Sequence, residues 1–356
     1  MKIIENFPHV YSNLLPTFFD SAIPRESLAT CQDCAMCSKG NQTNSLDIGY
    51  FSPTTKCCTY YPTLPNYLVG AILCDSDKDS LQGQSRILEK IRKKIGITPH
   101  SISPPRKHAL LYSNGNRGFG RSESLVCSFY VPEDGICSIW KNRESVCSTY
   151  FCKSISGVDG KDFWNATKSY LSHVQNCLAW YVLKELNFDL NELMIIFERY
   201  ENSSLDANDL DDRPCSDEEY SKIWQRWAMK EEDFYRLAFQ IVTNLSSSKL
   251  EKITGIVGQV LLEITKKKRE DMTNPKLPNI LKRNPAVTIY RRSSENSLVL
   301  APSGFFEIKN VLSEVLQYFD GTRTNAEARE LIKSDYGEAL TQELLISLYQ
   351  NRVLIP

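Results

Sequence analysis

Most of the cysteines in this chain fall into two short groups, and this clustering constrains the fold more than any other feature. The first group holds Cys31, Cys34, Cys37, Cys57 and Cys58, and the second holds Cys127, Cys137, Cys147 and Cys152. With 12 cysteines in 356 residues, the chain is far less cysteine-rich than a disulfide scaffold. The first residues lack the pattern of a secretory signal peptide, so we expect a cytoplasmic protein with reduced thiols. Clustered cysteines in that compartment indicate metal binding before catalysis or disulfides.

The first group has the spacing of a thiolate metal site. Cys31, Cys34 and Cys37 are separated by two residues each, so that neighbouring thiolates can face one ion or cluster while backbone amides point at the sulfurs. Such a run with a distant fourth cysteine is typical of a ferredoxin [4Fe-4S] site, and here Cys57 or Cys58 would be the fourth. Structural zinc sites use the same knuckles, so the spacing leaves both metals open.

The second group carries a resemblance to a known family. The residues involved are Gly135, Cys137, Ile139, Trp140, Arg143, Cys147, Tyr150 and Cys152. Together they resemble the signature of the YkgJ-like cysteine-cluster proteins, which are described as zinc- or iron-chelating domains. The resemblance implies that Cys31, Cys34 and Cys37 begin the upstream cysteine block of that family. In this chain the Cys57–Cys58 pair stands apart from the block, so which of the two is a ligand stays open.

The number of cysteines allows two arrangements of the metal. Five plus four thiols match two four-thiolate centres with one spare, or one such centre and a reactive thiol. The surplus of thiols and an expected aromatic shell of Phe129, Trp140, Tyr150 and Phe151 favour one or two [4Fe-4S] clusters, with zinc as the alternative. We expect Trp140 and Arg143 to lie beside the ligands, where Arg143 can donate hydrogen bonds to a thiolate.

Four other cysteines and histidines receive structural interpretations. Cys74 and Cys177 lie in apolar runs, which predicts core positions for both. His100 and His108 flank a proline-containing turn and are expected on the surface rather than in a metal site. Cys215 lies in an acidic loop, and the sequence assigns it no role.

A glycine-rich segment precedes the second cysteine group. Residues 112–125 include Arg117, Gly118, Gly120 and Arg121, and this combination allows close backbone approach to a ligand together with a guanidinium clamp. The segment is therefore a candidate ligand loop, with a flexible turn as the alternative. It matches neither a P-loop nor a dinucleotide-binding fingerprint.

The rest of the chain is predicted to be mainly α with small β elements, an α+β fold. The first 160 residues are loop-rich apart from a helix over residues 81–95. Long helical patterns then follow over residues 162–186, 190–200, 217–245 and 249–269. We therefore expect a cysteine-cluster metal domain with a helical body over residues 1–270. A basic, proline-containing linker over residues 266–284 leads into a C-terminal domain over residues 275–356.

The C-terminal domain has the element order of a small winged helix. Short strands are predicted over residues 287–291 and 298–301, and helices over residues 308–319, 325–336 and 342–348. The strand pair, the apolar turn at residues 304–306 and the segment 320–324 resemble the PqqD-like fold, a precursor-peptide recognition element. The resemblance implies that a peptide adds a strand to the sheet edge. An ordinary winged helix with a structural role is the alternative.

Charge and hydropathy exclude several functions. The chain has 42 basic and 43 acidic residues, which argues against a general nucleic-acid or anionic-membrane binder. No apolar run approaches the roughly 18 residues of a membrane span. These observations predict an iron-sulfur or other metalloprotein that takes part in modifying a peptide or protein held by the C-terminal domain. Whether it is itself the enzyme stays open, and a non-catalytic, zinc-stabilised interaction module is the alternative.

Overall fold

The computed structural model describes residues 2–22, 31, 34, 36–37, 50–115, 118–151, 154–202, 204–212 and 214–356. These residues are mainly helical with small antiparallel sheets, which confirms the predicted mainly α class with small β elements. The chain divides into two compact units. The first contains Met1–Ala22, Ala29–Tyr150 and Lys168–Leu261, and the second contains Ile23–Leu28, Phe151–Thr167 and Leu262–Pro356.

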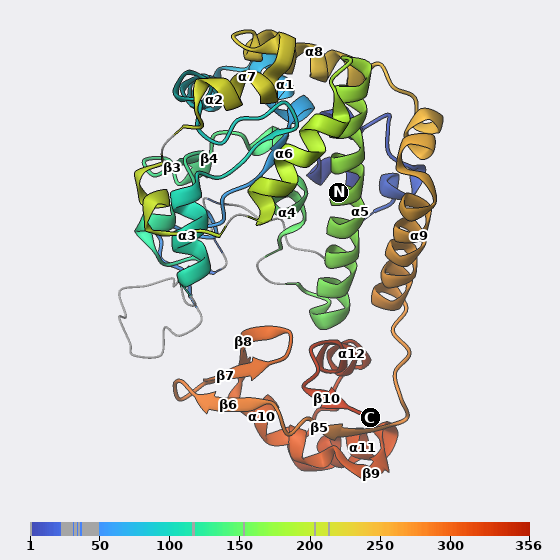
Figure 1. Ribbon diagram of the computed structural model, residues 1–356. Coiled ribbons are helices and arrows are strands. Elements are labelled where there is room, and N and C mark those ends of the chain that lie inside the picture. Colours follow the sequence, from blue (N-terminus) through green and yellow to red (C-terminus); the bar gives the residue numbers. More distant parts are fainter. Residues whose placement is uncertain are drawn as a thin grey trace. The chain divides into compact units, whose positions relative to one another are not determined.

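The first unit is built from helices and two short strand pairs (Figure 1). Its helices are α1 (Asn66–Cys74), α2 (Leu81–Lys93), α3 (Arg106–Asn114), α4 (Ser145–Thr149), α6 (Leu190–Asn202), α7 (Asp217–Trp224) and α8 (Glu231–Thr243), with parts of α5 (Gly157–Glu185) and α9 (Ser247–Thr273). Its strands are β1 (Leu64–Pro65), paired with β2 (Ser101–Ile102), and β3 (Tyr130–Val131), paired with β4 (Ile136–Cys137). Short 3-10 turns cover Ile3–Asn6, His9–Tyr11, Thr17–Asp20, Lys78–Ser80, Glu123–Leu125, Trp140–Asn142, Ala207–Asp211 and Gln225–Trp227.

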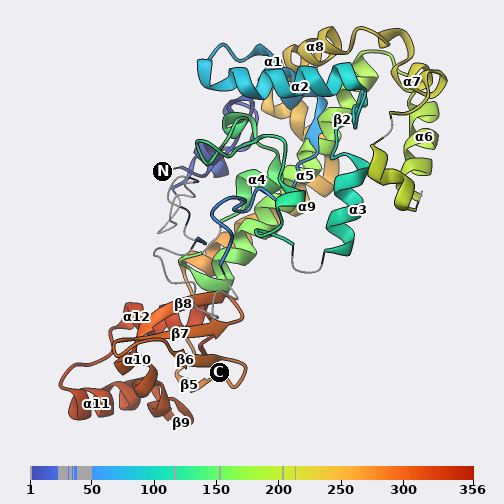
Figure 2. The same cartoon turned by 90° about the vertical axis from the view of Figure 1, so that its left-hand side faces the viewer.

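Helix α1 is buried on all sides in the first unit, apart from its last residue. Every residue from Asn66 to Leu73 is buried, so the helix has no polar face, and the sequence gives no amphipathic signal there. Gly70 faces the carbonyl of Tyr235 on α8 so closely that a Cβ atom would collide with it. Figure 2 shows α1, α2 and α8 gathered at one end of the unit. The predicted core position of Cys74 is wrong, because this last residue of α1 is exposed.

Two of the predicted long helices are interrupted. Left-handed backbone at Gln225 and Met229 divides the run over residues 217–245 into α7 and α8. In α9, Gly255 has a φ of 60° and breaks the helical hydrogen bonding. The Nε2 atom of His173 on α5 donates to the carbonyl of Thr254 at 2.9 Å, which satisfies an acceptor that the break leaves open. These interruptions depend on left-handed residues that hydrophobic periodicity does not report.

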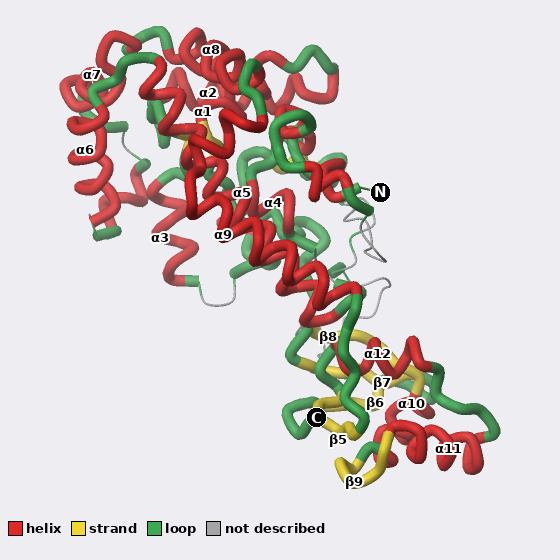
Figure 3. The backbone as a smooth tube through the Cα atoms, turned by 90° about the vertical axis from the view of Figure 1, so that its right-hand side faces the viewer, coloured by secondary structure: helices red, strands yellow, loops and turns green. Residues whose placement is uncertain are grey.

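The second unit contains two three-stranded antiparallel sheets, in the orders β10-β5-β9 and β6-β7-β8 (Figure 3). Its strands are β5 (Ile280–Arg283), β6 (Thr288–Arg291), β7 (Asn296–Ala301), β8 (Gly304–Lys309), β9 (Asp320–Thr324) and β10 (Leu354–Ile355). Its helices are α10 (Asn310–Val315), continued by a 3-10 turn over Leu316–Tyr318, α11 (Asn325–Tyr336) and α12 (Gln342–Gln350).

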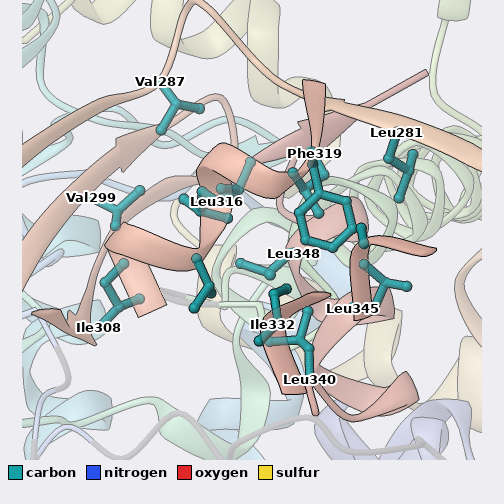
Figure 4. Packing of buried hydrophobic residues seen from close by; sticks show 14 residues of the cluster. Leu281, Val287, Val299, Ile308, Leu316, Phe319, Ile332, Leu340, Leu345 and Leu348 are labelled. Atoms are coloured by element: carbon teal, nitrogen blue, oxygen red, sulfur yellow. The ribbon is translucent and has the colours of Figure 1, made fainter. Parts of the chain in front are cut away.

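The sheets and helices of the second unit enclose one apolar core. Figure 4 shows Leu316, Phe319, Leu345 and Leu348 among its members, and Leu316 and Leu345 are fully buried. The predicted turn at residues 304–306 is wrong. These residues begin strand β8, whose Phe306 pairs with Val299 of β7, because the sheet needs an apolar third strand over this core.

The predicted linker over residues 266–284 is also structured at both ends. Helix α9 continues to Thr273, where Lys267 pairs with Asp271 at 3.1 Å, and strand β5 begins at Ile280. The second unit also includes the start of α5, where Asp159 pairs with Arg352 at 2.7 Å. No helix in the described part of the chain is long and apolar enough to span a membrane.

Candidate metal centre

The β3–β4 hairpin joins the second cysteine group to the first. Cys137 on β4 pairs with Tyr130 on β3, and Gly135 makes the turn between the strands with a φ of 64°. Just before β3, the backbone N–H of Cys127 donates to the carbonyl of Cys58 at 2.7 Å. The two cysteine groups, distant in sequence, therefore lie against each other in the first unit.

Lys56 provides a second link between the groups. Its buried ammonium donates to the carbonyl of Cys31 and, at 2.8 Å, to the carbonyl of Gly135 in the hairpin turn. The residue has a left-handed φ of 50° and is followed directly by Cys57 and Cys58. Sequence analysis missed Lys56, although a cation next to a cysteine pair is a signal that a thiolate site needs charge compensation.

Backbone amides approach the sulfurs of two hairpin cysteines. The N–H of Phe129 donates to the Sγ of Cys127 at 3.4 Å. The N–H of Ile139 donates in the same way to the Cys137 thiol, which lowers its pKa, although burial raises that pKa overall. In both cases the donor lies two residues after the cysteine. Hydrogen bonds of this kind stabilise thiolates and tune metal centres.

Neighbouring cysteines raise the pKa values of several thiols in the two groups. Burial and the neighbouring Cys57 and Cys137 raise the pKa of Cys31 to about 11. Burial and Cys34 raise the pKa of Cys37 to about 12. A hydrogen bond that the Cys58 thiol donates to Cys57, together with burial, raises the pKa of Cys58 far above its usual range. These raised pKa values favour the protonated thiols near neutral pH, whereas a bound metal ion would favour the thiolates.

Arg143 lies among the same thiols. Its guanidinium stacks on the ring of Trp140 at 3.4 Å and donates to the carbonyls of Trp140 at 3.0 Å and Cys147 at 3.2 Å. Burial lowers the pKa of Arg143, whereas Cys137, Cys147, Cys31 and Cys57 raise it. The side chain therefore offers positive charge to cysteines of both groups.

Glu144 positions the segment that carries Cys147. This buried carboxylate caps α4, where its oxygens accept from the N–H groups of Val146 at 2.6 Å and Cys147 at 2.9 Å. Burial raises the pKa of Glu144 despite these bonds. Burial and Glu144 in turn raise the pKa of the Cys147 thiol. The sequence pattern did not single out Glu144.

The described part of the glycine-rich segment contacts the chain itself. Gly120 donates to Thr59 Oγ1 at 2.6 Å, and a Cβ atom there would collide with the ring of Phe51. Arg121 Nε donates to the carbonyl of Tyr50 at 3.0 Å, and Gly118 lies between these contacts and α3. The segment therefore packs against and hydrogen-bonds to residues 50–59, which include Cys57 and Cys58. Arg117 lies outside the described residues.

Two sequence expectations around the site need correction. His108 is buried rather than on the surface, because α3, a helix the sequence analysis did not predict, turns it inward between the carbonyls of Thr59 at 3.3 Å and Leu125 at 3.0 Å. The expected aromatic shell is incomplete. Phe129 is buried and Phe151 is half-buried, but Trp140 and Tyr150 are exposed.

The site is open on one side. Cys31 and Cys137 line a cavity of about 580 Å³, together with Ser80, Trp140 and Lys141. No disulfide joins the cysteines in the described part of the chain. Within that part, no three cysteine, histidine or acidic side chains come together closely enough to hold one metal ion. Cys152, a predicted ligand, lies outside the described residues.

Comparisons with known proteins add no assignment: no family model, curated protein or solved structure matches this chain. The YkgJ-like and PqqD-like resemblances therefore depend on the residues quoted above.

Proposed function

We propose that the first unit is a cysteine-cluster metal domain that binds iron-sulfur, and that the protein takes part in modifying a peptide or protein held by a winged-helix domain in the second unit. Ligands are drawn from the cysteines of this unit, namely Cys31, Cys34, Cys37, Cys57, Cys58, Cys127, Cys137 and Cys147. When bound, such a group supplies electron transfer or Lewis-acid chemistry.

The grouping of thiols around the buried Lys56 and the half-buried Arg143 is the observation that supports the proposal most. Lys56 joins Cys31 to the hairpin turn, and Arg143 joins Trp140 to Cys147. A set of thiolates on one metal group carries net negative charge, and nearby cations and N–H donors offset that charge. Buried thiols without a metal would not need these two cations.

The cavity beside the cysteines supports chemistry over a purely structural role. Structural zinc sites are closed, whereas a reactive centre keeps an approach for its substrate. Here Cys31 and Cys137 line an open cavity, and Trp140 at its wall is 39% exposed. The N–H donors to Cys127 and Cys137 suit a zinc knuckle equally well, so a zinc-stabilised interaction module stays the second candidate.

The second unit has features that suit an extended peptide. Strand β6 lies at one edge of its sheet and pairs within the described residues only with β7. Tyr290 on this strand is 45% exposed. An exposed short edge strand can accept a partner strand through backbone hydrogen bonds. Helix α11 carries three acidic residues, Glu327, Glu330 and Asp335, against two basic ones, which disfavours DNA.

Metal content of matched variants tests the metal proposal. We expect Cys137→Ser to lose most of the metal of the anaerobically purified chain, because this thiol lies where both cysteine groups meet. Cys74→Ser is the control, since Cys74 is exposed at the end of α1 and should leave the metal content unchanged. Equal metal content in the two variants would refute the assigned ligand set.

Selection of displayed random peptides on the full chain tests the proposed partner. We expect enrichment of extended peptides, whose binding a proline in β6, as in Tyr290→Pro, weakens. Duplex DNA of random sequence should show no salt-sensitive binding. Tight DNA binding, or peptide binding that ignores the β6 substitution, would contradict this part of the proposal.

A further inference from the structure

A second cavity in the first unit has a different chemical character. It has a volume of about 710 Å³, which falls in the range of small-molecule sites. Its walls come from the turn after α2, the loop before α3, the middle of α5 and α6, and the Ala207–Asp211 turn. None of the predicted metal ligands lines it.

One wall is aromatic. The imidazole of His100 lies 5.1 Å from the ring of Trp180 and 6.2 Å from that of Phe197, measured between centroids. The centroids of Trp180 and Phe197 are 6.0 Å apart at an angle of 61°. Three rings from three segments thus provide flat apolar surface, which favours stacking with a planar ligand.

His100 also presents an unsatisfied polar atom. Its Nε2 is buried and has no hydrogen-bond partner in the described part of the chain. Burial lowers the pKa of His100 to about 4, opposed by a hydrogen bond with Asn176, so the ring is neutral near pH 7. Buried polar atoms without partners are rare in native proteins. A neutral imidazole has two ring nitrogens that can form hydrogen bonds. Because one of them bonds to Asn176, Nε2 remains for one hydrogen bond to a ligand.

The loop that carries His100 is fixed in place. The backbone carbonyl of His100 accepts from the N–H of Asn66 at 3.0 Å. The carbonyl of Thr98 accepts from the hydroxyl of Tyr235 at 2.8 Å. The N–H of Thr98 donates to Ser101 at 2.9 Å across the same turn. These bonds hold the imidazole at the wall before any ligand arrives, which lowers the ordering cost of binding.

The described cationic residues of the cavity already pair with carboxylates. Arg106 makes two hydrogen bonds to Asp209, at 2.5 and 3.2 Å. Lys94 pairs with Asp217 at 2.9 Å. Asp212 lines the same cavity and accepts from a backbone N–H at 3.0 Å. Because carboxylates already engage the cations, the cavity favours an uncharged ligand over an anion.

We propose that this cavity binds a small, uncharged, planar heteroaromatic molecule. Its ring stacks on Trp180 and meets the ring of Phe197 edge-on, and one in-plane polar atom hydrogen-bonds to His100 Nε2. The inference does not depend on the metal centre or on the second unit.

Calorimetric titration of the full chain with benzimidazole tests the proposal. Benzimidazole is flat and neutral at pH 7.5 and has a nitrogen donor and acceptor. We expect saturable binding at one site, at least tenfold tighter than that of indane, which has the same shape without a polar atom. Benzimidazole-5-carboxylate should also bind at least tenfold more weakly.

Variants assign the binding to this cavity. His100→Phe should weaken benzimidazole binding about tenfold, and His100→Gln should retain part of the affinity, because its amide keeps a hydrogen-bonding group. Trp180→Leu gives a second test that leaves His100 intact, and it should also weaken binding. His9→Phe is the control, because His9 is exposed and does not line this cavity. This variant should bind benzimidazole with the affinity of the parent chain. Absence of saturable binding, equal binding of the carboxylate, or unchanged affinity in folded His100→Phe would overturn the proposal.

Discussion

Lys56 is the residue whose role depends most on tertiary structure. Its ammonium is buried and donates to two carbonyls that are 104 residues apart in sequence, those of Cys31 and Gly135. Replacing one member of a buried charged hydrogen-bond set leaves acceptors unsatisfied, which costs about 1–3 kcal/mol. Such a residue affects both the stability of the first unit and the charge around the thiols.

Substitution of Lys56 by Met should therefore weaken metal retention. We expect the metal to transfer to a chelator about tenfold faster and the free energy of unfolding to fall by about 1–3 kcal/mol. Lys93→Met is the matched control, because Lys93 pairs with Glu89 on the surface of α2. The hypothesis fails if both variants release metal at the rate of the parent chain.

Arg143 should tune the centre without being a ligand. Arg143→Ala removes the stack on Trp140 and the bond to the Cys147 carbonyl. We expect metal to remain bound with a changed reduction potential or faster release, since a nearby positive charge is lost. Arg92→Ala, on α2, is the control. An unchanged absorption spectrum and reduction potential in Arg143→Ala would show that Arg143 does not influence the metal centre.

His100 predicts a pH dependence of stability. Its pKa is lowered to about 4 by burial, below the ordinary value of 6.5. Between these values the unfolded chain binds a proton that the folded chain does not, so His100 lowers the stability as the pH falls from 6.5 towards 4. The stability difference between the parent chain and His100→Gln should shift in favour of the variant from pH 7.5 to pH 5. Denaturant titrations at both pH values measure it, and a constant difference would contradict the assigned burial.

At the level of elements, the contact of α1 with α8 depends on Gly70. A methyl group there would meet the Tyr235 carbonyl and the side chain of Phe239. We expect Gly70→Ala to destabilise the first unit by about 1–3 kcal/mol, measured by denaturant unfolding. Cys74→Ala, at the exposed end of the same helix, should change the stability by less than about 0.5 kcal/mol. Similar effects of the two substitutions would contradict the close packing.

The amphipathic elements were predictable from sequence, and the fully buried ones were not. Helix α2 and much of α5, α6 and α9 follow the expected periodicity. Helix α1 is covered on all sides, so its residues show no polar face to mark a helical period. Residues 304–306 are predicted to form an apolar turn, whereas strand β8 begins at Gly304 and continues in register with β7 to Lys309.

At the scale of the whole molecule, the helical periodicity predicted the mainly α class, but not which segments meet. The cysteines form two groups in the sequence, yet the bond from Cys127 to Cys58 closes a loop of about 70 residues that local patterns do not encode. The same applies to Lys56, whose contact with the Gly135 carbonyl exists only after the hairpin is in place.

The second unit is larger than the predicted C-terminal domain. It includes Phe151–Thr167, and its residues Arg352 and Gln350 bond to Asp159 and to the carbonyl of Met272. We predict that a fragment of residues 275–356 folds by itself but is less stable than the same unit in the full chain, because these contacts are lost. Calorimetric unfolding compares the two, and an unfolded fragment would rule out independent folding.

The metal content of the parent chain tests the central claim most directly. Protein purified without oxygen is analysed for iron, acid-labile sulfide and zinc per chain, together with its visible absorption. The account predicts iron and sulfide in equal amounts, about four of each per cluster, and a broad absorption near 400 nm. A colourless chain with zinc and no sulfide, or a metal-free chain whose cysteines are in disulfides, would contradict it.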